Sequence, residues 1–394
     1  MIVVAELVCL FRHQVSRPLA GVSPRLLLVS LFVVLWCTSC TGLDAGSPEN
    51  GPRPIVAVGD VHGDYDNFLR VLQQAGVIDQ RGNWAAGNTQ LVQLGDVPDR
   101  GPDTHRVIEL LQRLEDQAGR QGGAVHVLIG NHEAMNMLGD LRYVHPGEYA
   151  ALASDNADQL RQRYFELVVQ RRRQQDPEFE ATAEYRRQWE QRFPPGYVEH
   201  RLTWAPDGDY GSWVLEHDAV LKLGRTLFVH GGIGPDVLGR SIEELNSGIR
   251  EELSLGEAGP PLEDGLATSV GGPLWYRGLA MNEEAAESDH LEAVLAFYGV
   301  DRVVIGHTPL LGVILPRFDG RVLVIDSGIS SYYGGHLASL RIEGEQLFSI
   351  QRGERLRIPV GDQELIPYFE QLVTLKPDHQ ALEAYLMQLQ DRRP

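Results

Sequence analysis

A pattern of short apolar runs that end at glycine and a polar residue constrains the fold of this chain most strongly. Each run is rich in β-branched residues and is bounded by a turn signal, which is typical of a buried strand. The runs span residues 55–58, 90–94, 124–129, 226–229, 302–305 and 322–325. Apolar stripes at helical spacing lie between the first of them, at 68–75 and 107–114. This alternation predicts βαβ units in an open sheet, whose ligands bind at the carboxyl ends of the strands.

The corners that end these runs carry residues able to bind metal or phosphate. They are Gly59–Asp64, Gly95–Gly101, Gly130–Glu133, His230–Gly232 and Gly306–Thr308. Any one of them alone is usually a turn or a helix cap, but five such corners in one fold would converge on one edge. Their Asp, His and Asn side chains form a mixed oxygen and nitrogen set suited to two divalent first-row metals. No cysteine follows Cys40, so a thiolate zinc site is excluded from residue 41 onward.

The ordered motifs GDxHG, GDxxDRG, GNHE, HGG and GHT resemble those of the calcineurin-like metallophosphoesterases. Further stretches at 77–84, 135–144 and 273–278 are similar to the bacterial Shewanella-like branch of the phosphoprotein phosphatases. The resemblance covers about residues 54–345. It implies an α/β fold in which two mixed β-sheets pack as a sandwich flanked by helices, here with a helical insertion.

The resemblance also implies a set of metal ligands. They are Asp60, His62, Asp96, Asn131, His230 and His307. Asp96 would bridge both ions, because a carboxylate can serve two cations about 3.5–4 Å apart. The ions implied are Mn, Fe or Zn, and Asn131 is also expected to face the substrate.

Other residues are expected to act on the phosphate and the leaving group. His132 would donate a proton to the leaving oxygen, and Asp99 would orient its ring. Arg100 would hold two phosphate oxygens in bidentate fashion. Arg277 is the candidate for a second, opposing arginine, because the charge of the transition state favours another guanidinium. The alternative for Arg277 is a surface residue on a loop.

The resulting hypothesis is a binuclear-metal phosphatase that hydrolyses phosphate monoesters, on phosphoproteins, by attack of a metal-bridging hydroxide. A nucleotide hydrolase or phosphodiesterase with the same metal core is the alternative. A non-catalytic binding module is disfavoured, because the ligands and His132 are all present. The partner expected is a phosphorylated substrate. The formal net charge of −19 gives no support to a nucleic-acid partner.

The first 40 residues are predicted to be a secretory leader. Arginines precede an apolar run at 26–36, and small residues follow it. The stretch Cys37–Cys40 resembles a bacterial lipoprotein processing site, with Cys40 as the lipidated residue. The protein is therefore expected to be exported to the bacterial cell envelope or periplasm and anchored by lipid. A plain secreted form, a buried N-terminal helix and a start placed too far upstream are the alternatives.

The remaining chain is divided by composition. Residues 41–53 are small and polar and predict a linker, followed by a metallophosphoesterase domain at 54–350. Within it, 153–200 is dense in Arg, Gln and Glu, which predicts two amphipathic helices inserted over the site. Further helices are expected at 240–253 and 288–299, a long loop at 254–272, and a helical tail at 351–394.

Overall fold

The computed structural model describes residues 52–259, 265–361, 365–377 and 379–391. The predicted leader and nearly all of the predicted linker lie outside these residues. Within them, no helix is both long enough and apolar enough to span a membrane.

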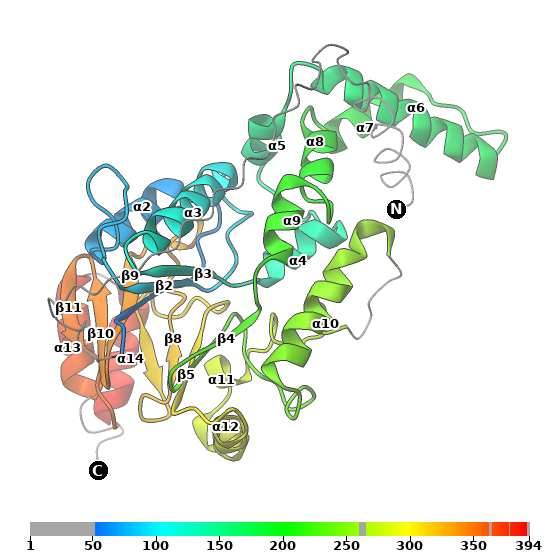
Figure 1. The fold of residues 1–394 in the computed structure, drawn as a ribbon. Helices are drawn as coiled ribbons and strands as arrows, with labels where there is room; N and C mark the ends of the chain where they lie inside the picture. The colour runs from blue at the N-terminus through cyan, green and yellow to red at the C-terminus, as the bar shows by residue number, and fades with distance from the viewer. Residues whose placement is uncertain (1–51, 260–264, 362–364, 378, 392–394) are drawn as a thin grey trace, which may run out of the picture.

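Two mixed β-sheets form the centre of the molecule (Figure 1). The first has the order β11-β10-β9-β1-β2-β3. Its strands are β1 (Ile55–Val58), β2 (Gln90–Gln93), β3 (Ala124–Val127), β9 (Ala338–Glu343), β10 (Gln346–Gln351) and β11 (Glu354–Arg357). β1, β2 and β3 run parallel, whereas β9 is antiparallel to β1 and continues into an antiparallel β9–β10–β11 meander.

The second sheet has the order β4-β5-β6-β8-β7. Its strands are β4 (Val220–Leu223), β5 (Thr226–Val229), β6 (Arg302–Ile305), β7 (Leu315–Arg317) and β8 (Val322–Val324). β5, β6 and β8 run parallel, and β4 and β7 are antiparallel edge strands. Apolar side chains of both sheets, such as Val56 and Leu91 from the first and Phe228 and Val304 from the second, belong to one buried cluster. The predicted α/β fold with two mixed sheets is therefore confirmed.

Helices flank the sheets where the sequence shows apolar stripes. α2 (Tyr65–Gln74) and α3 (Thr104–Gly119) lie along the first sheet, and α4 (Asn131–Leu138) begins at the end of β3 (Figure 1). α10 (Ile242–Ser254), α11 (Gly278–Met281) and α12 (Glu284–Tyr298) accompany the second sheet. The 3-10 turns are η1 (Gly256–Ala258) and η2 (Ser331–Tyr333). The predicted helices at 240–253 and 288–299 thus correspond to α10 and α12.

The inserted helical region is longer than the sequence indicated. It contains α5 (Pro146–Leu152), α6 (Ala157–Gln175), α7 (Ala183–Arg192), α8 (Tyr197–Thr203) and α9 (Asp209–Leu215). It has its own small core, in which Tyr164, Phe165 and Trp189 are buried. Figure 1 shows α6 and α7 beyond α5 and α8, away from both sheets. α6 and α7 therefore extend away from the sheets, and the position of the insert over the site stays a prediction.

The C-terminal region differs from the predicted helical tail at 351–394. β11 lies within it, so the first sheet continues to Arg357. Only then do α13 (Leu365–Leu375) and α14 (Gln380–Asp391) follow, which pack beside this end of the sheet (Figure 1). The prediction failed here because β11 has the sequence ERLR, whose polar composition carries no strand signal.

Candidate active site

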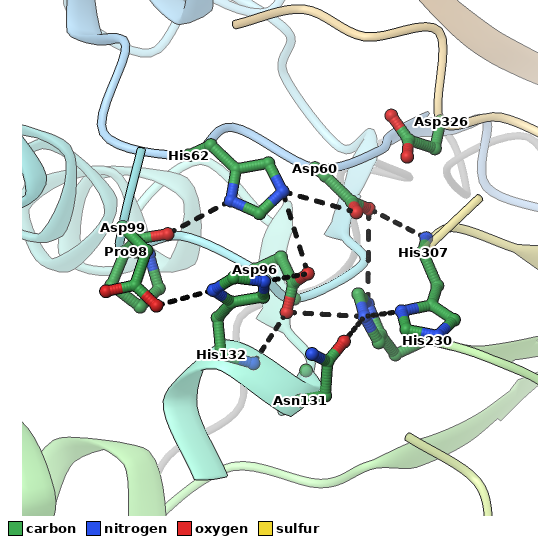
Figure 2. A network of polar contacts seen from close by, with 12 residues as sticks. Asp60, His62, Asp96, Pro98, Asp99, Asn131, His132, His230, His307 and Asp326 are labelled. Carbon is green, nitrogen blue, oxygen red and sulfur yellow. Dashed lines mark hydrogen bonds and ion pairs between the residues drawn. The ribbon is translucent and has the colours of Figure 1, made fainter. Parts of the chain in front are cut away.

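The corners after strands of both sheets meet at one site (Figure 2). In the first sheet Val58 pairs with Gln93, and Gln93 with Val127, so β1, β2 and β3 end level with one another. The second sheet repeats this arrangement, because Val229 pairs with Ile305 and Ile305 with Val324. A hydrogen bond of 3.0 Å from the His307 backbone N–H to Asp60 Oδ1 joins the two sets of corners.

Strained backbone is concentrated at these corners. Of the nine described non-glycine residues with positive φ, five lie there: His62, Asp96, Asp99, Arg100 and His307. Each such residue costs on the order of 1–3 kcal/mol and persists only where the surrounding structure imposes it. Gly130 is required for a different reason, since a Cβ at this position would lie 2.4 Å from the Asp96 carboxylate. The strained backbone at these corners therefore directs their side chains toward one another.

Backbone carbonyls fix the orientation of two histidines. Nδ1 of His62 lies 3.1 Å from the Pro98 carbonyl, and Nδ1 of His230 lies 2.6 Å from the Leu94 carbonyl. A carbonyl can only accept, so each Nδ1 must carry the hydrogen, which leaves the Nε2 lone pair free to bind a metal in the neutral ring. Burial is the largest effect on the pKa of His62 and lowers it to about 3, which keeps this ring neutral.

The side chains proposed as ligands are brought together around Asp96. Oδ2 of Asp96 lies 3.7 Å from His62 Nε2, and its Oδ1 lies 3.3 Å from His230 Nε2. On the first side Asp60 Oδ2 is 3.9 Å from His62 Nε2. On the other side His230 Nε2 is 3.0 Å from Asn131 Oδ1 and 3.2 Å from His307 Nδ1. Asp96 therefore belongs to two groups of potential ligands at once.

The chemistry of this donor set fits metal ions. Asp60 and Asp96 are each 2 % exposed, and the only basic groups within ion-pair distance of them among the described residues are imidazoles. Burial, followed by the charges of Asp326 and Asp96, raises the pKa of Asp60 well above its usual range. Carboxylate, amide and imidazole lone pairs thus converge here, and among the described residues no Lys or Arg side chain pairs with the two carboxylates. Divalent metal ions would supply the missing positive charge.

His132 and Asp99 form a buried pair beside Asp96. His132 Nδ1 lies 2.5 Å from Asp99 Oδ2, while Asn136 Nδ2 donates to Asp99 Oδ1 at 3.0 Å. Burial alone would lower the pKa of His132, but the carboxylates of Asp96 and Asp99 outweigh it and raise that pKa. The raised pKa favours the protonated form of the ring. Its Nε2 is 3.8 Å from Asp96 Oδ2, so His132 also falls within one group of potential metal ligands.

The two arginines expected at the site occupy different environments. The Arg100 side chain lies among tyrosines and donates from Nη1 to the Tyr332 hydroxyl at 3.1 Å. Arg277 is exposed and is fixed to the rim of the second group of ligands. Its Nη1 donates to the His307 carbonyl at 2.8 Å and to Thr308 Oγ1 at 2.9 Å.

Sequence reasoning missed residues that support the site. Asp326, which follows β8, is buried beside Asp60, and burial raises the pKa of Asp326 to about 6. Its signal was present, because the apolar run at 322–325 is followed directly by Asp326, with a glycine two residues further on. Glu133 accepts backbone hydrogen bonds from Gly130, Asp96 and Val97, and so ties two corners together.

Contacts between distant segments could not be inferred from the sequence. Glu148 of α5 accepts a hydrogen bond of 2.9 Å from the backbone N–H of Asp99, 49 residues away. Arg201 of α8 is buried and donates to the Asn136 carbonyl of α4 at 2.6 Å. The helical region therefore supports the site from its base, through α5 and α8.

Comparisons with known proteins agree with this geometry. The family model of the calcineurin-like phosphoesterases matches residues 53–310. An uncharacterized protein of Schizosaccharomyces pombe is 35% identical over 76% of this chain and 80% of its own length. Shewanella-like protein phosphatase 2 of Arabidopsis thaliana is 28% identical over 71% of this chain and 72% of its own length.

A solved structure supports the same assignment. The cold-active protein-tyrosine phosphatase of a psychrophilic Shewanella species is 28% identical, with a TM-score of 0.58 over 78% of this chain and 80% of that one. The chain belongs to the calcineurin-like phosphoesterase family and is a metal-dependent phosphoester hydrolase.

Proposed function

We propose that this protein is a phosphatase that hydrolyses phosphate monoesters on phosphoproteins, with two metal ions held on either side of Asp96. The observation that carries the proposal is the position of Asp96. Its carboxylate faces His62 on one side and His230 on the other, and its Oδ1 accepts the backbone N–H of His132 at 2.9 Å. The same residue thus organises both groups of ligands and the histidine proposed as acid.

The protein groups have distinct tasks in this proposal. Asp60, His62 and Asp96 would hold one ion, and Asp96, Asn131, His230 and His307 the other. Ions bound there, of Mn, Fe or Zn, would supply Lewis-acid activation of the phosphate and of water. His132 would donate its proton to the leaving oxygen while Asp99 holds its ring. Arg100 and Arg277 would bind phosphate oxygens, with Asn131 facing the same group.

The names of similar proteins favour a phosphoprotein as the substrate. Both the Arabidopsis relative and the Shewanella structure are named as protein phosphatases. A nucleotide hydrolase or phosphodiesterase with the same metal core is the competing function. The two functions differ in the phosphate group that the site must accept. A phosphate monoester presents three free oxygens, whereas a phosphodiester or a phosphate within a polyphosphate chain carries a second substituent in place of one of them.

A substrate panel at matched metal tests the proposal. The protein would be stripped of metal, reconstituted separately with Mn, Fe or Zn, and assayed on p-nitrophenyl phosphate, phosphotyrosine and phosphoserine peptides, bis-p-nitrophenyl phosphate and diadenosine tetraphosphate. The highest kcat/KM on a phosphopeptide supports a phosphoprotein phosphatase. A kcat/KM that is higher on the diester or the dinucleotide refutes it in favour of the alternative.

We also propose that the protein is exported to the cell envelope and anchored by lipid at Cys40. This proposal depends on the leader sequence alone, in which the apolar run at 26–36 precedes the stretch Cys37–Cys40. Such a location would place the phosphatase on extracytoplasmic phosphoproteins.

A further inference from the structure

Arg100 is surrounded by aromatic rings instead of carboxylates. Its guanidinium carbon lies 3.7 Å from the ring centroid of Tyr143 and 4.8 Å from that of Tyr332. Its Nη1 donates to the Tyr332 hydroxyl, and its buried Nε has no hydrogen-bond partner among the described residues. No carboxylate within the described part of the chain lies within ion-pair distance of it. The positive charge of Arg100 is therefore held in place without being neutralised.

The choice of aromatic partners has a chemical consequence. A carboxylate would hold the guanidinium through the same N–H groups that a phosphate needs, and it would compete with the substrate. The face of a tyrosine ring attracts the cation through its quadrupole and occupies none of its N–H groups, so within the described ranges only the Nη1 donor to Tyr332 is engaged. We propose that Tyr143 and Tyr332 are positioning residues that hold Arg100 ready for the phosphoryl group. This inference rests on the phosphate-binding role proposed for Arg100.

Both tyrosines are themselves anchored to the site. The Tyr143 carbonyl accepts the backbone N–H of Arg100 at 3.0 Å, so the ring and the arginine belong to one local unit. Tyr332 lies in the turn η2, where the backbone N–H and the hydroxyl of Ser331 both donate to Asp64 Oδ2 at 2.7 Å. Asp64 ends the first corner motif and has no role among the metal ligands. We infer a structural role for Asp64, because its carboxylate fixes the turn η2 that carries Tyr332.

The test compares removal of each ring with its conservative replacement. Tyr143→Leu and Tyr332→Leu should raise both KM for p-nitrophenyl phosphate and the inhibition constant of inorganic phosphate. A cation–π contact corresponds to a change of about 2- to 30-fold in these constants. Tyr143→Phe keeps the aromatic face and should restore values close to wild type. Metal content and the melting temperature should stay near wild type in all three variants.

A double-mutant cycle shows whether the rings act through Arg100. In an Arg100→Ala background, Tyr143→Leu should add less than about a twofold change, because the cation that it positions is gone. Phe348→Leu is the matched control. It removes a ring 3.6 Å from the Arg355 guanidinium, on the β10–β11 hairpin away from the site, and should leave both constants unchanged.

The outcomes separate the inference from the proposed function. If Arg100→Ala raises both constants but the two Leu variants do not, the positioning role is overturned while the phosphate-binding role of Arg100 stands. A full effect of Tyr143→Leu in the Arg100→Ala background also overturns it. If Arg100→Ala changes neither constant, the phosphate-binding role fails, and the inference fails with it.

Discussion

Replacing His132 tests whether the buried His132–Asp99 pair supplies a proton to the leaving group. Burial lowers the pKa of His132, but the charge of Asp96 and the 2.5 Å contact with Asp99 outweigh it and raise this pKa, which favours the protonated ring. General acid catalysis is worth about 10²–10⁴-fold, which corresponds to about 2.7–5.4 kcal/mol of activation free energy. His132→Asn should lose this factor on phosphoserine peptides, whose alkoxide leaves only with a proton. On p-nitrophenyl phosphate, whose nitrophenolate leaves as an anion, the loss should stay under about tenfold.

The assay is kcat/KM on both substrates at saturating metal, with metal content measured in the same samples. Asp99→Asn should show a weaker form of the same pattern, because Asp99 orients the ring and does not donate the proton. A His132→Asn variant that keeps its metal but loses the same factor on both leaving groups would refute the acid assignment. Loss of metal from this variant would instead make His132 a ligand, as its place beside His62 and Asp96 allows.

Three further predictions concern the rest of the molecule. Glu133→Gln weakens the acceptor of three buried backbone N–H groups and should lower the melting temperature by several degrees, whereas an unchanged melting temperature would contradict its structural role. Burial, followed by the Arg352 charge, lowers the pKa of Lys376 to about 7 in the folded protein. The pKa of a lysine in the unfolded chain is about 10.4, so between pH 7 and 10.4 the unfolded state binds more protons than the folded state. The free energy of unfolding of the wild type relative to Lys376→Met should therefore rise by up to about 1.4 kcal/mol per pH unit from pH 7 toward 10, and equal slopes in the two proteins would refute this. Cys40→Ser should move the protein out of the detergent-soluble membrane fraction, and unchanged fractionation with an unchanged mature mass would reject lipidation.

Most of the strands that the sequence predicted are buried on both faces. The apolar runs of β1, β5 and β6 cannot be exposed to water, so composition alone identifies them. β9 alternates apolar and polar residues and so carries a strand signal of its own. β10 breaks this alternation at Leu347 and Phe348, and the edge strand β7 contains Pro316, so these two carry a weaker signal. The antiparallel pairing of β9 with β1 depends on a return of the chain at residue 338, which local patterns do not encode.

The same distinction applies to the site. All the proposed ligands stand in corner motifs that the sequence shows, and the structure brings them together because the preceding strands end at the same edge. Asp326 obeys this rule too and could have been found by applying it to β8. Tyr332 could not, because its contact with Arg100 joins residues 232 positions apart and depends on how η2 is anchored to Asp64. Side chains that support a site from other elements require the tertiary structure.

The most direct test of the account is the metal content of Asp96→Asn. If the Asp96 carboxylate is shared by two ions, removing its charge should abolish nearly all phosphatase activity and most bound metal, while circular dichroism shows a folded protein. Elemental analysis of the wild type, reconstituted in parallel, should give two metal equivalents per chain. Two equivalents in Asp96→Asn, together with near-normal turnover, would contradict the central claim that Asp96 organises a binuclear site.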